Sequence, residues 1–234
     1  MDKNKWLTPE EIEIECLDES RNDKSTARLC SINREFKQGF EFIESYKDSV
    51  SFFGSARFTE ENEHYIDALD LAYKIVNELD FIVVTGGGPG IMEAANKGAK
   101  EAGGISLGLP IRLKNEENVN KYVTDAVRFN NFSARKTTLT YAASAYIFYP
   151  GGFGTLDELF EILTLTQTNK IPKAPIFLMG SDYWGPMDKF IRENVLELHE
   201  AIDKTDVNIY KVLDTHEEVL DAIRKHKGEL SKRF

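Results

Sequence analysis

YPGGFGTLDE, residues 149–158, joins two segments of different character. Before it, residues 145–149 form a short apolar run of aromatic and β-branched side chains, which predicts a buried strand. After it, apolar residues recur from Leu156 with the i, i+3, i+4, i+7 spacing of a helix face. A glycine-rich turn between a strand and a helix N-terminus presents unpaired backbone N–H groups and the positive end of the helix dipole. Both features suit a phosphate group.

Side chains in this turn add to the predicted anion site. Its glycines let the backbone approach an anion closely, and Thr155 supplies a hydroxyl at the helix start. Asp157 and Glu158 are expected in the first helical turn, beside the phosphate. One acid there is ordinary helix-dipole chemistry, whereas a carboxylate next to a bound phosphate ester can also act on the sugar. The turn therefore predicts a phosphate site with acid–base chemistry beside it.

The charge balance restricts the ligand. The 234 residues include 29 Lys and Arg against 39 Asp and Glu, which gives a net charge of −10. Such a chain is not expected to bind nucleic acid, because that binding depends mostly on basic side chains that neutralise phosphates. A small phosphorylated ligand held by backbone amides is compatible with the acidic charge. The hydrophobic fraction of 41% is enough for one α/β domain with a core.

The cysteines and the N-terminal segment indicate the compartment. Cys16 and Cys30 form no CxxC pair and no metal-ligand spacing, so reduced thiols and no metal site are expected. Residues 1–19 are polar and acidic, unlike a signal peptide. No apolar run approaches the roughly 18 residues that a membrane span needs. We therefore expect a cytoplasmic protein with no membrane partner.

Strand and helix patterns alternate along the chain. Apolar runs predict strands at 49–53, 81–85, 105–109, 126–129, 145–149, 174–179 and 209–213. Helical patterns lie between them, including 131–143 and 184–199, and a capping box at 215–218 begins the last helix. This alternation predicts an α/β fold, a Rossmann-like doubly wound parallel sheet with helices on both faces. We expect residues 49–234 to form this domain, with the predicted phosphate site in it, and residues 1–48 to form an N-terminal helical extension.

Glycine turns follow three of the predicted strands. Ligands of such sheets bind at the carboxyl ends of the strands, where the turns at Gly54, 86–90 and 151–154 would meet. This concentration of glycine favours a nucleotide-like ligand. The turn at 86–90 lacks the NAD-binding spacing, and no acid ends the following strand, so a dinucleotide oxidoreductase is disfavoured.

Three motifs in order make the sequence similar to the Lonely Guy (LOG) family. They are GGGPGIMEAAN at 86–96, FSARK at 132–136 and PGGFGTLDEL at 150–159. The resemblance covers roughly residues 49–215 and looks like the longer bacterial branch, whose members are often labelled "possible lysine decarboxylase". It implies a cytokinin riboside 5′-monophosphate phosphoribohydrolase, which cleaves the N-glycosidic bond of a nucleoside 5′-monophosphate to give free base and ribose 5-phosphate. AMP-like nucleotides are substrates of some relatives, and a homodimer without a cofactor is expected.

The resemblance also implies roles for individual residues. Arg135 and Glu158 match the family's catalytic pair. Substrate-binding residues are expected in the three glycine turns and at the positions that match the family on neighbouring segments. They are Gly54, Ser55, Gly87, Gly88, Glu116, Lys136, Gly151, Gly152, Gly154, Thr155, Asp157 and Thr164. Glu117 is adjacent to Glu116 and is an open alternative to it. Tyr149, where the family usually has leucine, and residues 131–133, where relatives are more aromatic, depart from the pattern and bear on base preference.

The chemistry can also be argued directly. Breaking a ribosyl C–N bond passes through an oxocarbenium-like state, which a nearby carboxylate such as Glu158 stabilises. Arg135 would orient that carboxylate or grip the phosphate or ribose. Two alternatives stay open: a non-catalytic nucleotide-binding or carrier protein of the same fold, and a pyridoxal phosphate-dependent decarboxylase, for which no scaffold signal is present. Histidines in charged contexts are expected to be solvated, namely His64, His199, His216 and His226.

Overall fold

The computed structural model describes residues 24–46, 48–112 and 119–230. Within them a single parallel sheet of seven strands runs in the order β4-β3-β2-β1-β5-β6-β7. The strands are β1 (Ser49–Phe53), β2 (Ile82–Thr85), β3 (Ser106–Gly108), β4 (Asp125–Ala126), β5 (Ala145–Phe148), β6 (Ile176–Met179) and β7 (Tyr210–Leu213). The order extends one way from β1 to β4 and the other way from β5 to β7. The neighbours β1 and β5 therefore form the topological switch point, where ligands of such sheets bind.

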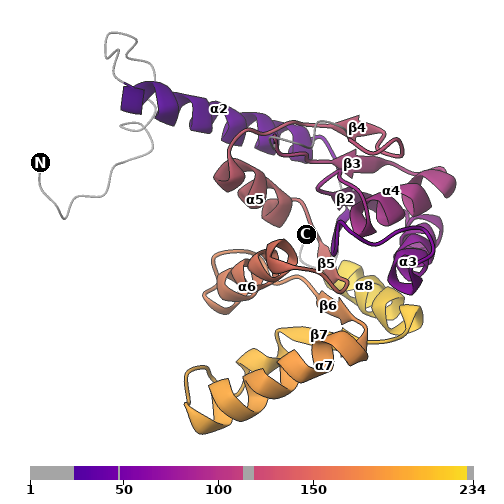
Figure 1. Cartoon of the computed structure of the whole chain (residues 1–234), viewed down its shortest axis with the longest axis vertical. Helices are drawn as coiled ribbons and strands as arrows, with labels where there is room; N and C mark the ends of the chain where they lie inside the picture. The colour runs from indigo at the N-terminus through magenta and orange to yellow at the C-terminus, as the bar shows by residue number, and fades with distance from the viewer. Residues whose placement is uncertain (1–23, 47, 113–118, 231–234) are drawn as a thin grey trace, which may run out of the picture.

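Helices cover both faces of the sheet (Figure 1). α3 (Glu63–Leu79), α4 (Ile91–Glu101) and α8 (His216–Leu230) pack on one face, where Val50 and Phe52 point. α5 (Phe132–Tyr141), α6 (Phe153–Gln167) and α7 (Ser181–Phe190) pack on the other, where Phe53 points. Successive side chains of a strand face opposite ways, so apolar runs are required for burial on both sides. The predicted doubly wound α/β fold is confirmed.

Some predicted boundaries are wrong. β4 contains two residues instead of 126–129, and Phe129 meets Ile111 only in an isolated bridge, because β4 is the short edge of the sheet. The helix predicted at 184–199 begins at Ser181, whose N–H donates to Asp214 Oδ1 at 2.7 Å. From residue 191 to 198 this helix widens into a π-helical stretch. A short 3₁₀ helix at 206–208 precedes β7.

α2 (Lys24–Glu44) is the helix predicted within the N-terminal extension. It lies against α5, and Gly39 makes this possible because a Cβ there would lie 2.2 Å from Thr138 Oγ1. Glu35 of α2 is buried and accepts hydrogen bonds from the backbone N–H groups of Asn130 and Asn131. Burial opposes ionisation, yet a hydrogen bond from the Asn130 side chain together with these two backbone bonds holds the pKa of Glu35 below its usual range. The division of the chain at residue 48 stays a prediction.

Within the described ranges, no helix combines the length and apolarity needed to traverse a bilayer.

Candidate active site

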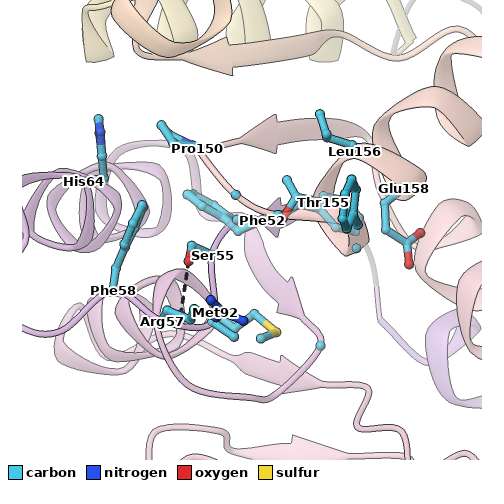
Figure 2. Close-up of a pocket in the computed structure, with 18 of the residues that line it drawn as sticks. Phe52, Ser55, Arg57, Phe58, His64, Met92, Pro150, Thr155, Leu156 and Glu158 are labelled. Atoms are coloured by element: carbon cyan, nitrogen blue, oxygen red, sulfur yellow. Dashed lines mark hydrogen bonds between the residues drawn. The ribbon is translucent and has the colours of Figure 1, made fainter.

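A cleft of about 1120 Å³ lies at the switch point between β1 and β5 (Figure 2). The segment after β1, the start of α3, the turn after β5 and the starts of α6 and α7 contribute its walls. The predicted site residues that line it are Gly54, Ser55, Arg135, Gly151, Gly152, Gly154, Thr155, Asp157 and Glu158. The topology of the sheet explains why these residues lie close together, because the carboxyl ends of neighbouring parallel strands lie at one edge of the sheet.

The turn after β5 leads directly into α6. Gly152 is the N-cap, in an extended conformation and with no side-chain capping bond. The N–H groups of the first turn of a helix have no intrahelical partner, so this N-terminus offers backbone donors and the positive dipole end to the cleft. Pro150 O accepts from Ser55 N at 3.0 Å, and Gly151 O accepts from Tyr183 Oη at 2.6 Å. These bonds fix the turn to the segment after β1 and to α7.

The expected start of α6 is wrong by two residues. The helix begins at Phe153, so Asp157 and Glu158 lie in its second turn and no acid lies in the first. The reason is that glycines on both sides of Phe153 let the chain enter the helix inside the turn. Gly151 could not be larger, since a Cβ there would lie 2.2 Å from Thr155 Oγ1. Glu158 is therefore about one helical turn from the N-terminus, and 8% exposed.

Arg135 of α5 lies against Glu158 of α6. Its Nη1 is 3.9 Å from Glu158 Oε1, and its Nε donates to the carbonyl of Leu109 after β3 at 2.7 Å. Gly86 allows the guanidinium to occupy this position, because a Cβ there would lie 2.2 Å from Arg135 Nη2. The two side chains are 14% and 10% exposed, so solvent screens their attraction weakly.

Burial decides the protonation of this pair. Desolvation raises the pKa of Glu158 to about 7, although the positive charges of Arg135 and Lys136 oppose the rise. Burial also lowers the pKa of Arg135, against the pull of Glu158, but a guanidinium remains charged at neutral pH. Glu158 Oε2 is buried and has no hydrogen-bond partner within the described part of the chain. The site thus holds a carboxyl group that titrates near neutrality, which is the range suited to acid–base catalysis.

Some predicted residues lie outside the cleft. Lys136 is not among the residues that line the cleft; it forms ion pairs of 2.9 Å with Asp157 and Glu161 and acts on Glu158 through its charge. Thr164 is exposed on α6 and donates to the carbonyl of Phe160. The carbonyls of Gly87 and Gly88 accept from Asn120, and it is Gly86 that lines the cleft. Glu116 and Glu117 lie outside the described residues.

Other residues line the cleft that were not among the predicted site residues. They are Arg57, Phe58, Asn62, Glu63, His64, Met92, Phe132, Asp182 and Tyr183. The available signal was position: most of them directly follow the carboxyl end of a strand or begin the next helix.

His64 and His216, which were predicted to be solvated, are instead at least partly buried. His64 is half-buried and stacks on Phe58. His216 has an 11% exposed side chain, and its Nε2 lies 2.8 Å from Asp67 Oδ1. Asp67 Oδ2 in turn accepts from the hydroxyl of Tyr149 at 2.6 Å. Tyr149, the departure from the family pattern, therefore ties the end of β5 to α3 and α8.

Fold and cleft together define a Rossmann-like α/β protein with a helix N-terminus beside a buried carboxylate–guanidinium pair. Residues 92–223 match the family model described as "Possible lysine decarboxylase". The chain is 33% identical over 159 residues to the probable cytokinin riboside 5′-monophosphate phosphoribohydrolase LOG4 of Oryza sativa subsp. japonica, covering 67% of each chain. It is 31% identical to the cytokinin riboside 5′-monophosphate phosphoribohydrolase LOG5 of Arabidopsis thaliana, over 66% of this chain and 68% of that one. The chain belongs to the LOG family.

Solved structures agree on the fold. The molybdenum cofactor carrier protein of Chlamydomonas reinhardtii superimposes with a TM-score of 0.59 at 22% identity, over 78% of this chain and 99% of that one. At this identity the likeness shows the fold alone.

Proposed function

We propose that this protein hydrolyses the N-glycosidic bond of a nucleoside 5′-monophosphate, AMP-like or a cytokinin riboside 5′-monophosphate, to free base and ribose 5-phosphate. The observation that carries the proposal is the buried Glu158–Arg135 pair one helical turn from the uncapped N-terminus of α6. A 5′-phosphate held by that N-terminus brings the attached ribose close to the carboxylate. The names of the relatives support the same reaction.

Glu158 carries the chemistry in this proposal. As the C1′–N bond breaks, the bonding electrons leave with the base, and positive charge develops on the ribose ring. Ionised Glu158 stabilises that charge and takes a proton from a water molecule, whose oxygen bonds to C1′. The proton then passes to the departing base directly or through solvent. With a pKa of about 7, Glu158 can both accept and release this proton at neutral pH.

Arg135 positions the carboxylate in the same proposal. Leu109 O fixes its Nε, so its Nη1 stays directed toward Glu158. The 3.9 Å separation leaves both oxygens of Glu158 able to accept a water or ribose hydroxyl proton. A cytoplasmic location and a homodimer form part of the proposal.

Lysine decarboxylation is disfavoured despite the family description. Decarboxylation with pyridoxal phosphate uses a lysine that forms a Schiff base with the cofactor. Among the described residues that line the cleft there is no lysine. The nearby Lys136 is held in ion pairs with Asp157 and Glu161, and ion pairing stabilises the protonated amine, which cannot attack a carbonyl.

A carrier protein is the second candidate. Solved structures with this fold include a protein named as a molybdenum cofactor carrier, so the fold also supports binding without turnover. The two candidates share the phosphate site at α6 and differ only in what Glu158 does.

A panel of nucleotides separates these candidates. The purified protein is incubated with AMP, other nucleoside monophosphates and adenosine, and ribose 5-phosphate and free base are measured. We expect hydrolysis of monophosphates and none of adenosine. Equal turnover of AMP and adenosine would overturn the phosphate assignment, and AMP binding without product would favour the carrier.

A further inference from the structure

The cleft extends to both sides of the predicted phosphate site. Figure 2 shows Glu158 at one end, Phe58 and His64 at the other, and Thr155 of the α6 N-terminus between them. The 5′-phosphate is the terminal group of a nucleoside monophosphate. If it binds at α6 with its ribose toward Glu158, no part of that nucleotide extends toward Phe58 and His64.

The size of the cleft supports a second compartment. Pockets for small molecules commonly have volumes of about 300–1,000 Å³. This cleft, with about 1120 Å³, exceeds that range. Its length along the edge of the sheet results from the segment after β1, which runs from Gly54 past Phe58 before α3 begins at Glu63.

Aromatic rings dominate the far compartment. The rings of Phe58 and His64 stack with centroids 5.6 Å apart and 30° between their planes. Asn62 Oδ1 accepts from the backbone N–H of His64, which fixes the start of α3 and with it the backbone that carries the imidazole. Tyr183 also lines the cleft, and its hydroxyl donates to Gly151 O at 2.6 Å. Such a set of rings suits a planar group, because nucleobases stack on aromatic side chains with little dependence on sequence.

Charge in the far compartment argues against a free terminal phosphate, such as that of ADP. Glu63 and Asp182 line it with exposed carboxylates, and Arg57 is the basic residue among its described walls. A terminal diphosphate would add negative charge next to these acids in a chain of net charge −10. In a dinucleotide joined through its 5′-phosphates each phosphate keeps one ionised oxygen, so the ligand carries no more negative charge than AMP.

We propose that the Phe58–His64 compartment binds a second nucleobase, so that the cleft accepts dinucleotides joined through their 5′-phosphates as well as monophosphates. The proposal rests on the proposed function for the orientation of the first nucleotide. In the corresponding reaction water adds to C1′ of the ribose next to Glu158 and that base leaves. The phosphoanhydride stays intact, and the second nucleoside remains in the far compartment.

Calorimetric titration tests the compartment without relying on hydrolysis. The full-length Glu158→Gln variant is titrated with AMP, ADP and P1,P2-di(adenosine-5′) diphosphate, which keeps the ligands intact. One base–aromatic stack corresponds to about tenfold in affinity. We expect the dinucleotide to bind about tenfold more tightly than AMP, and ADP no more tightly than AMP. A dinucleotide that binds no better than AMP overturns the proposal.

Two substitutions locate the effect. Phe58→Leu, in the same Glu158→Gln background, keeps an apolar side chain and removes the aromatic ring. It should abolish the higher affinity for the dinucleotide and change the affinity for AMP by less than twofold. Phe132→Leu is the matched control, because Phe132 lines the cleft from α5, the helix that carries Arg135; it should not narrow the difference in affinity between the two ligands. His64→Ala provides an independent variant, because its backbone N–H retains the Asn62 bond. If Phe58→Leu and His64→Ala weaken AMP as much as the dinucleotide, the compartment holds the first base and the proposal is wrong.

Binding of the dinucleotide and hydrolysis of AMP, both measured on the wild-type protein, separate this proposal from the proposed function. Wild-type protein that binds the dinucleotide through Phe58 but releases no ribose 5-phosphate from AMP contradicts the hydrolase and supports the compartment. Hydrolysis of AMP without tighter binding of the dinucleotide supports the hydrolase and contradicts the second compartment.

Discussion

Arg135 Nη1 stands 3.9 Å from Glu158 Oε1, within range for attraction but beyond a hydrogen bond. The two residues belong to α5 and α6, the helices before and after β5, so the switch point of the sheet sets their separation. A closer bidentate pair would hold the carboxylate permanently ionised and occupy its oxygens. The observed spacing instead leaves burial as the stronger influence, with the pKa of Glu158 at about 7.

Glu158→Gln should abolish most of the activity. The substitution keeps the shape of the side chain and removes its charge, while the backbone donors of α6 remain. We expect kcat to fall by about 10²–10⁴-fold with nucleotide affinity nearly unchanged. Steady-state kinetics and AMP titration measure the two quantities. Should Glu158→Gln hydrolyse as fast as the wild type, Asp157 or Glu116 becomes the next acid to test.

The same substitution should stabilise the protein in a pH-dependent way. The pKa of Glu158 is raised from 4.5 to about 7 on folding, so the folded state binds the proton more tightly than the unfolded state. Stability contributed by the protonated form is present below about pH 4.5 and is lost as the pH rises to about 7. Glutamine does not titrate and so does not lose this stability. Between pH 4.5 and pH 8, the free energy of unfolding of Glu158→Gln should therefore rise relative to that of the wild type by about 1–3 kcal/mol.

Urea unfolding of both proteins at the two pH values measures this difference. Asp157→Asn, one position earlier with a 63% exposed carboxylate, is the matched control and should show a much smaller change. A stability difference between wild type and Glu158→Gln that is independent of pH would show that the carboxyl has no raised pKa.

Gly86→Ala should displace Arg135. The new Cβ would lie 2.2 Å from Nη2 of the guanidinium and 2.8 Å from the sulfur of Met92. Without Arg135 in place, Glu158 loses its orientation and its ionised form is less favoured, so kcat should fall at least tenfold and the apparent pKa of the kcat/KM profile should rise. Gly185→Ala in α7, where a Cβ has no atom within 4 Å, is the control. Equal activity of the two variants would argue against a role for Arg135.

Much of the fold could be predicted because its strands are buried on both faces. Residues 145–148 and 176–179 are fully buried, and such strands appear in a sequence as short apolar runs between turns. β4 could not be bounded in this way, because its two residues are not buried, whereas Val127 and Phe129 just after it are buried and carry the apolar pattern of a strand. The start of α6 was misjudged because glycine is unfavourable in helices, yet Gly154 lies in the first turn of this one.

The residues that line the cleft were predicted where they belong to a continuous sequence motif. They were missed where only tertiary packing brings them to the cleft. Glu158 and the turn before it form one continuous motif. Phe58 gains its position from the path of the chain between β1 and α3, and His64 from the place where α3 begins; no periodicity encodes either. His216 and Asp67 are 149 positions apart, so a charged sequence context gave the wrong expectation of solvation.

The surface of α5 and α6 predicts self-association. Large aromatic side chains are exposed there, namely Phe132, Tyr141, Phe153 and Phe160. Exposed aromatic side chains on neighbouring helices are typical of an isologous interface, so we expect a dimer of about twice the 26.6 kDa chain mass. Light scattering at micromolar concentration measures it. Phe160→Glu, at a side chain 46% exposed, should shift the mass toward the monomer, whereas Ile66→Glu on α3, at 55% exposure, should not. A clean 26.6 kDa species in the wild type would contradict the dimer, and equal dissociation by both variants would place the interface elsewhere.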